Sequence, residues 1–122
     1  MEIFGEEYGF KLTIGASAAI AELCPEGDLA RIEEVLDGKR VAKVINFTAS
    51  FIEALAKGFD DARRYAGEEV THKPLTADMV KALPSNVFKE VQSAAIAAFR
   101  SDTETTVEVA PSKKEENDRT KA

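Results

Sequence analysis

Residues 41–66 read VAKVINFTASFIEALAKGFDDARRYA, a stretch whose apolar residues recur at steps of three and four. Such spacing places side chains on one side of an α-helix. The residues at these steps are Val41, Val44, Ile45, Thr48, Ile52, Leu55 and Phe59. Phe47, Phe51 and Tyr65 widen this face to an arc of roughly 160°, whereas an ordinary surface helix needs only roughly 100°. The stretch therefore predicts one long amphipathic helix with more apolar surface than a core requires.

Length and composition are those of a single-domain protein. The 122 residues are 44% apolar and 31% charged, which is enough to close one modest core. The net charge of −6 argues against nucleic-acid binding, which needs a basic surface. No apolar run approaches the roughly 20 residues of a membrane span. With Cys24 as the one cysteine and an acidic N-terminus unlike a signal peptide, the sequence predicts a cytoplasmic, soluble protein without an internal disulfide.

Alternating residues near the N-terminus predict a small β-hairpin. Residues 8–14 (YGFKLTI) place three apolar side chains on one side, the period of two that is typical of a half-buried strand. Residues 3–4 could pair with this strand across residues 5–7. A two-stranded hairpin is marginal alone, so it has to pack on helices or gain another strand.

Four further helices are predicted from apolar spacing, capping residues and prolines. They span residues 16–23, 28–36, 76–83 and 86–100, with Ser17, Asp28, Thr76 and Ser85 as the capping residues. Residues 103–109 (TETTVEV) favour a short C-terminal strand that could join the hairpin, and residues 112–122 are polar enough to be disordered. The predicted fold is mainly α (α+β): about five helices and the hairpin over residues 1–102, then the strand and a polar tail over residues 103–122.

Little in the sequence points to catalysis. His72 is the only histidine and lies in a polar loop, where a surface position is expected, and no group of residues has metal-ligand spacing. Cys24 lies at the C-terminal end of a predicted helix, where the helix dipole disfavours a thiolate. We therefore expect Cys24 to be a small apolar residue of the core. Adjacent acids such as Asp60–Asp61 are expected on solvated faces, and Gly58 is expected to allow close packing or to mark a bend or an end of its helix. We expect no enzyme activity, no metal and no cofactor.

Five aromatic residues are the candidate partner-binding residues: Phe47, Phe51, Tyr65, Phe88 and Phe99. Either the hairpin or the last helix covers Phe47, Phe51 and Tyr65 as part of the core, or part of this flank, together with Phe88 and Phe99, is open and receives an amphipathic helix from a partner. Exposed aromatic residues would also suit a homo-oligomer. The centre of the apolar face of the long helix, at Val44, Ile45, Ile52 and Leu55, is expected to be core.

Two groups of segments resemble a known protein family. The first comprises residues 9–17 (GFKLTIGAS) and 20–25 (IAELCP), and the second comprises residues 73–80 (KPLTADMV), 88–92 (FKEVQ) and 97–100 (AAFR). Together with the intervening helix they are similar to the tail assembly chaperones of long-tailed bacteriophages, particularly those in prophages of Gram-positive hosts. The similarity extends over most of the chain, from about Met1 to Lys114, and consists of helix starts and apolar positions without a catalytic signature.

The resemblance implies a binding function. Such chaperones bind the long, helical tape measure protein in the host cytoplasm and keep its apolar surface from aggregating until tail tube proteins displace them, and they are not expected in the mature virion. Families of this kind often make a longer product by programmed frameshifting, and the lysine codons within residues 112–114 (SKK) could provide the slippery site. The alternative is a structural or adaptor protein of phage morphogenesis, for example a head–tail connector, that stays in the particle.

Overall fold

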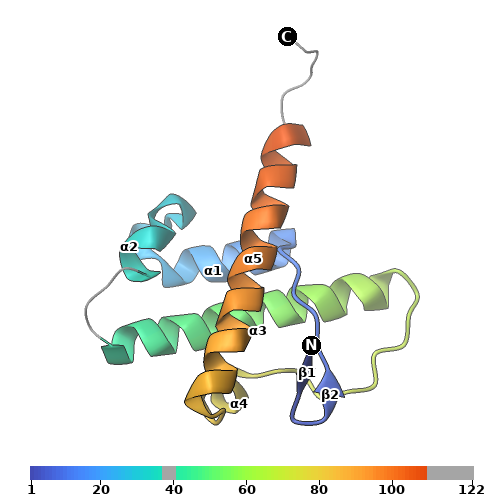
Figure 1. The fold of residues 1–122 in the computed structure, drawn as a ribbon. Coiled ribbons are helices and arrows are strands. Elements are labelled where there is room, and N and C mark those ends of the chain that lie inside the picture. The colour runs from blue at the N-terminus through green and yellow to red at the C-terminus, as the bar shows by residue number, and fades with distance from the viewer. Residues whose placement is uncertain (37–40, 110–122) are drawn as a thin grey trace.

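The computed structural model describes residues 1–36 and 41–109, and over these residues the protein is mainly helical with an N-terminal hairpin (Figure 1). In chain order the elements are β1 (Glu2–Ile3), β2 (Glu6–Glu7), α1 (Ile14–Leu23), η1 (Pro25–Gly27), η2 (Leu29–Arg31), α2 (Ile32–Leu36), α3 (Val41–Tyr65), α4 (Ala77–Lys81) and α5 (Ser85–Val109). The predicted fold class is confirmed. The predicted end of the second helix at residues 37–38 and the predicted disorder of residues 112–122 lie outside the described residues.

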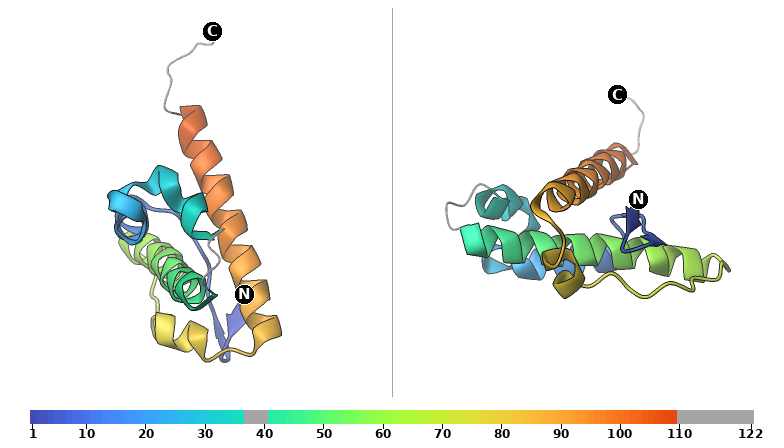
Figure 2. Two further views of the ribbon diagram at one scale, coloured as in Figure 1. Left: turned by 90° about the vertical axis from the view of Figure 1, so that its left-hand side faces the viewer. Right: turned by 60° about the horizontal axis from the view of Figure 1, so that its bottom comes forward.

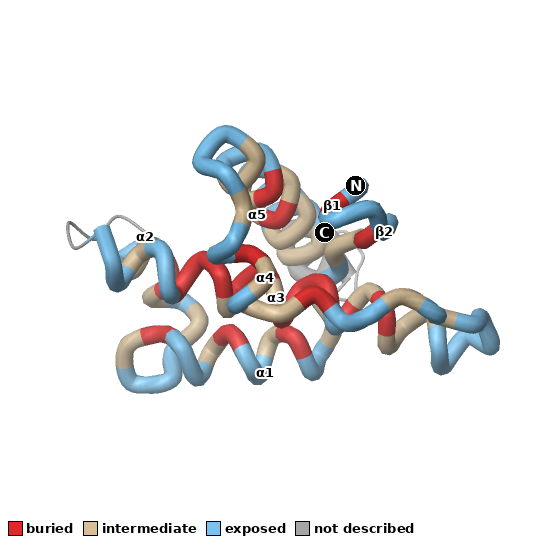
Figure 3. Tube along the Cα trace, turned by 90° about the horizontal axis from the view of Figure 1, so that it is seen from below, coloured by how far each residue is buried: buried red, intermediate tan, exposed pale blue. Residues whose placement is uncertain are grey.

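The long helix α3 forms the centre of the molecule. Helices α1, α2, α4 and α5 all pack on it, and α5 crosses over its middle (Figures 1 and 2). Figure 3 shows that buried positions concentrate along the middle of α3 and become sparse toward both of its ends. The buried residues of α3 are Phe47, Thr48, Ala49, Phe51, Ile52, Ala54, Leu55, Ala56, Gly58 and Asp60. The broad apolar arc is thus used mainly to pack neighbours on several sides of one helix.

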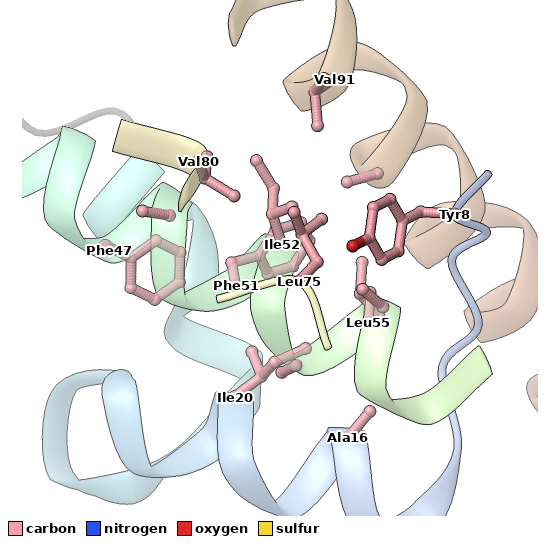
Figure 4. Close-up of a cluster of buried hydrophobic side chains, with 14 of the residues drawn as sticks. Tyr8, Ala16, Ile20, Phe47, Phe51, Ile52, Leu55, Leu75, Val80 and Val91 are labelled. Carbon is pink, nitrogen blue, oxygen red and sulfur yellow. The ribbon is translucent and has the colours of Figure 1, made fainter. Parts of the chain in front are cut away.

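The core joins side chains from almost every element (Figure 4). Ile52 and Leu55 of α3 are completely buried, as are residues of α1, α4 and α5. These partners are Ile20, Val80, Val91 and Ala95, and the buried loop residues Tyr8 and Leu75 complete the cluster. Core positions for Ile52 and Leu55 are therefore confirmed.

Most helix starts follow from capping side chains. Asp28 accepts a hydrogen bond from the amide of Ala30, and Thr76 accepts one from the amide of Met79, as the sequence predicts. The first helix starts earlier than expected, because Thr13, not Ser17, caps it by accepting from the amide of Ala16 at 3.1 Å. In α5, Ser85 is the first helical residue, and the amide of Phe88 donates to the carbonyl oxygen of Pro84.

The predicted strand over residues 8–14 is wrong. The hairpin is shorter and lies earlier, with Glu2 opposite Glu7 and Ile3 opposite Glu6 across a turn at Phe4 and Gly5. Both turn residues have positive φ, which the glycine adopts without steric cost. The terminal ammonium group reinforces the hairpin by donating to Glu7 and to the carbonyl oxygen of Tyr8.

The predicted strand over residues 103–109 is also wrong, because α5 continues through these residues to Val109. Thr103 is compatible with a helix since its hydroxyl donates to the carbonyl oxygen of Phe99, one turn earlier, at 2.7 Å. A sequence rich in threonine and valine has strand propensity, but an established helix can override such a preference.

Residues 8–13 form a segment that we call the N-terminal strap, which runs across α3 and reaches α5. The amide of Lys11 donates to the carbonyl oxygen of Leu55 at 3.1 Å, and the amide of Leu12 donates to the carboxylate of Asp102 at 2.8 Å. Gly58 makes this crossing possible. A Cβ atom there would lie 2.5 Å from the carbonyl oxygen of Lys11, so the expected close packing at Gly58 is confirmed.

Replacing Gly58 with alanine should destabilise the protein even though alanine is the better helix former. We expect a net loss of about 1–2 kcal/mol in the free energy of unfolding, because overpacking against backbone outweighs the gain in helix propensity. Gly15→Ala in α1 is the control, since an added Cβ meets nothing closer than 4.0 Å. That variant should gain roughly 0.4–1 kcal/mol. Urea denaturation measures both; equal stabilisation by the two substitutions would contradict the packing argument.

Thr48 carries a buried hydroxyl that has no hydrogen-bond partner among the described residues. Thr48→Val should therefore raise the free energy of unfolding by about 1 kcal/mol, because it removes an uncompensated polar group. Thr103→Val is the matched control, since it deletes a hydroxyl that is hydrogen-bonded. A less stable Thr48→Val variant in thermal melts would show that the hydroxyl has a partner after all.

Candidate functional site

The structure separates the five predicted partner-binding aromatics into different environments. Phe47 and Phe51 are only 6% and 1% exposed and belong to the core. Their rings stack at 6.0 Å, and the ring of Phe51 meets that of Phe99 edge-on at 5.4 Å. The idea that Phe47 and Phe51 flank an open groove is therefore wrong for this structure, because both rings are buried and Phe51 packs on Phe99 of α5 (Figure 4).

The other three aromatics differ in exposure and position. Phe99 is half-buried against the core, and Phe88 is half-buried near the start of α5. Tyr65 is 93% exposed at the C-terminal end of α3. Partner binding by any of these residues stays a prediction. Phe88 lines a surface hollow that is dominated by apolar side chains.

This hollow, which we call the α3/α5 groove, lies where α3 and α5 begin. Its volume is about 460 Å³, within the roughly 300–1,000 Å³ that is typical of binding pockets. The lining residues are Val41, Val44, Ile45, Lys81, Leu83, Ser85, Phe88, Lys89 and Gln92. Val41 is 70% exposed and Ile45 is 39% exposed, so apolar side chains of α3 face solvent here.

The groove lies at the start of α3, because α1 is much shorter than α3 and α5, which is equally long, crosses α3 without running along it (Figures 1 and 2). A helix of 25 residues spans roughly 37 Å, whereas the 10 residues of α1 span roughly 15 Å. The start of α3 is therefore left partly uncovered, and the expectation that Ile45 belongs to the core is wrong. The mismatch in helix lengths is visible in the sequence and could have indicated uncovered apolar residues at the ends of α3.

The charges around the groove are the reverse of those of the whole chain. The sequence contains 22 acidic and 16 basic residues, but the lining contains Lys81 and Lys89 and no acidic residue. Lys81 donates to the side-chain carbonyl oxygen of Asn46 at 3.3 Å and lies 3.9 Å from the exposed carboxylate of Asp78. In residues 1–36 and 41–109, no ion pair engages Lys89.

A second hollow, between α1 and the opposite part of α3, has a different character. Its volume is about 540 Å³, and its lining contains Glu53, Asp60, Asp61, Lys57 and Arg64. Lys57 and Arg64 both donate to the carboxylate of Asp61, at 2.6 and 3.0 Å. These hydrogen bonds hold the pKa of Asp61 below its usual value, the bond from Lys57 contributing most. The cations here are already paired, so this hollow is a weaker candidate for binding a charged partner.

His72 and Asp60 form a largely buried pair, which corrects two predictions. The expectations that His72 lies on the surface and that Asp60 lies on a solvated face are both wrong. The side chains are 9% and 3% exposed, and Nε2 of His72 lies 3.0 Å from each carboxylate oxygen of Asp60. The ring of His72 also packs on Tyr8 at 4.4 Å, and the hydroxyl of Tyr8 donates to the carbonyl oxygen of Lys73 at 2.7 Å. These contacts fasten the loop after α3 to the N-terminal strap.

Burial raises the pKa of Tyr8, and the nearby Glu6 and Asp60 add to the effect. The phenol therefore keeps its proton and remains a hydrogen-bond donor. Cys24 is buried as expected, with its thiol 3.4 Å from the carbonyl oxygen of Ile20. Burial, and secondarily Asp28, raises the pKa of this thiol, which makes it a poor nucleophile.

A search of the described ranges finds no group of three or more histidine, cysteine or acidic side chains that could hold a metal ion. Nor does any helix within residues 1–36 and 41–109 combine the length and apolar character needed to cross a membrane. Comparison with known proteins found no matching family, no significantly similar curated protein and no significantly similar solved structure. The absence of enzyme activity stays a prediction.

The His72–Asp60 pair should be worth more to stability than a surface ion pair. His72→Phe keeps a ring against Tyr8 but leaves the carboxylate buried without its partner, so we expect a loss of about 3 kcal/mol. In a double-mutant cycle with Asp60→Asn, the coupling should exceed about 1 kcal/mol.

The matched control is the exposed pair Lys57–Asp61, in a cycle built from Lys57→Gln and Asp61→Asn. We expect a coupling of about 0.3–0.5 kcal/mol there, because solvent screens this pair. Urea denaturation provides the seven stabilities that are needed, since the two cycles share the unmodified protein. Coupling of equal size in the two cycles would contradict a special role for the buried pair.

Proposed function

We propose that this protein is a phage tail assembly chaperone that holds a helix of the tape measure protein in the α3/α5 groove. The observation that carries the proposal is a groove of exposed apolar side chains on a small, mainly helical domain. The sequence resemblance to tail assembly chaperones supports the same function and supplies the identity of the partner. The protein would act in the host cytoplasm and be absent from the mature virion.

The groove has the properties expected of a site for an amphipathic helix. Val41, Ile45 and Phe88 come from two helices and offer apolar surface that a partner could bury. Burial contributes roughly 25 cal/mol per Å² before the costs of association are subtracted. A partner helix would present residues spaced by three and four positions, which is how helices commonly bind in grooves.

Release is as important as capture for this function. Tail tube proteins have to displace the chaperone while they polymerise around the tape measure protein, so the complex must dissociate readily. An open groove suits this requirement, because only one face of the bound helix is buried and its other face stays accessible to the incoming tube subunits. A deep or fully enclosed pocket would slow the exchange.

Ile45 provides the sharpest test of the groove. Ile45→Asp places a charge on a partly exposed residue, so the fold should survive while copurification with the coexpressed tape measure protein falls at least about tenfold. Ile14→Asp is the control, because Ile14 is 89% exposed and lies outside the groove lining. Circular dichroism melts of both variants check the fold. Unchanged copurification by Ile45→Asp would contradict binding in this groove.

Two further measurements separate the remaining possibilities. Tyr65→Asp tests the other exposed aromatic residue; loss of binding in this variant alone would move the contact surface to the opposite end of α3. Mass spectrometry of purified virions tests the assignment itself, since a chaperone should be absent or present in traces. A stoichiometric amount would favour the connector alternative. Phe51→Asp is unsuitable for these tests because it would place a charge in the core.

A further inference from the structure

We infer that the α3/α5 groove selects helices that carry acidic residues beside their apolar stripe. This inference rests on the proposed function, because it specifies the chemistry of the helix that the groove would hold. It adds the requirement of acidic residues on the bound helix, which follows neither from the apolar lining nor from the resemblance to a family. The argument depends on the two lysines of the lining and on the charge of the rest of the chain.

Lys81 and Lys89 come from different elements and border the same apolar surface. Lys81 is the last residue of α4, Lys89 lies in the second turn of α5, and α3 contributes Val41, Val44 and Ile45 to the lining. The groove therefore has cationic groups next to apolar ones. A helix lying on Ile45 and Phe88 would bring the residues that flank its stripe close to these lysines.

Lys89 is available for such pairing, and Lys81 is held only by a 3.3 Å hydrogen bond to Asn46 and a long contact with Asp78. Lys89 makes no ion pair with any residue in the described parts of the chain, and Lys81 is only 3.9 Å from a carboxylate that is itself almost fully exposed. The second hollow is the opposite case, because Lys57 and Arg64 there are both bonded to Asp61. Charge complementarity thus favours the α3/α5 groove as the place for an acidic partner.

The net charge of −6 makes this placement selective. An acidic helix is repelled by most of the molecular surface and attracted at the groove, which fixes where it binds. A helix with lysines beside its stripe is attracted by the acidic remainder of the surface but is repelled at the groove by Lys81 and Lys89. Repulsion therefore contributes to specificity together with attraction. We expect the two effects together to give a difference in affinity of about tenfold at low salt.

Two designed peptides test the inference on the intact protein. Both have the same apolar stripe of leucines spaced by three and four positions; one has glutamates beside the stripe and the other has lysines. Fluorescence anisotropy of labelled peptides should show about tenfold tighter binding of the glutamate peptide in 50 mM salt, and the preference should shrink at 300 mM salt.

Charge-reversal variants connect this preference to the groove. In Lys81→Glu/Lys89→Glu the preference should vanish or invert. The control Lys11→Glu/Lys57→Glu makes the same change in net charge outside the groove lining and should keep most of the preference. Both parent lysines in the control are exposed, so folding should be retained.

Three outcomes would overturn the inference. Equal affinity for the two peptides would exclude selection by charge, and an equal loss of preference in the two double variants would show that only net charge matters. Binding of neither peptide, with Ile45→Asp converting a dimer into a monomer, would identify the groove as an interface between copies of this chain. The copurification test with the tape measure protein is independent of the peptides, so the proposed function and this inference can fail separately.

Discussion

The fold depends on burial of the middle of α3 by elements that approach it from several directions. A helix can be covered by other helices along ridges and grooves, but the N-terminal strap covers it with extended backbone. Extended backbone can approach so closely only where a side chain is missing, which is the position of Gly58. The amide of Lys11 in the strap then donates a hydrogen bond to the carbonyl oxygen of Leu55, which holds the strap on α3. The strap in turn positions Tyr8 and, through Asp102, the second half of α5.

Local chemistry made much of the architecture predictable. The spacing of apolar residues predicts α3 almost to its last residue, and the caps at Asp28 and Thr76 are where the side chains indicate. The errors arose where a segment is determined by distant contacts. The apolar residues of segment 8–13 alternate as in a strand, but this segment crosses α3 and pairs with no strand in the described part of the chain. Residues 103–109 have strand propensity, but they continue helix α5.

The candidate site was less predictable than the fold. A helical wheel groups residues by the face of the helix on which they lie. It cannot show where along the helix axis the packed neighbouring elements end. Phe47 and Phe51 lie on the broad apolar face of the wheel, yet both are buried, while Ile45 on the same helix is partly exposed. The pairing of Asp60 with His72 was similarly hidden, because it joins residues across a loop whose path the sequence does not specify.

The length of α5 also determines how the protein can be attached to something else. From Ser85, which lines the groove, to Val109 the helix extends roughly 36 Å along its axis, and its second half projects from the body of the molecule (Figure 1). Whatever chain continues from Val109 therefore begins about one helix length from the groove. A fluorescent protein, a solid support or a second domain joined there would be kept at a distance from a bound helix. The C-terminal end of α5 and the α3/α5 groove are therefore separated by the length of this helix.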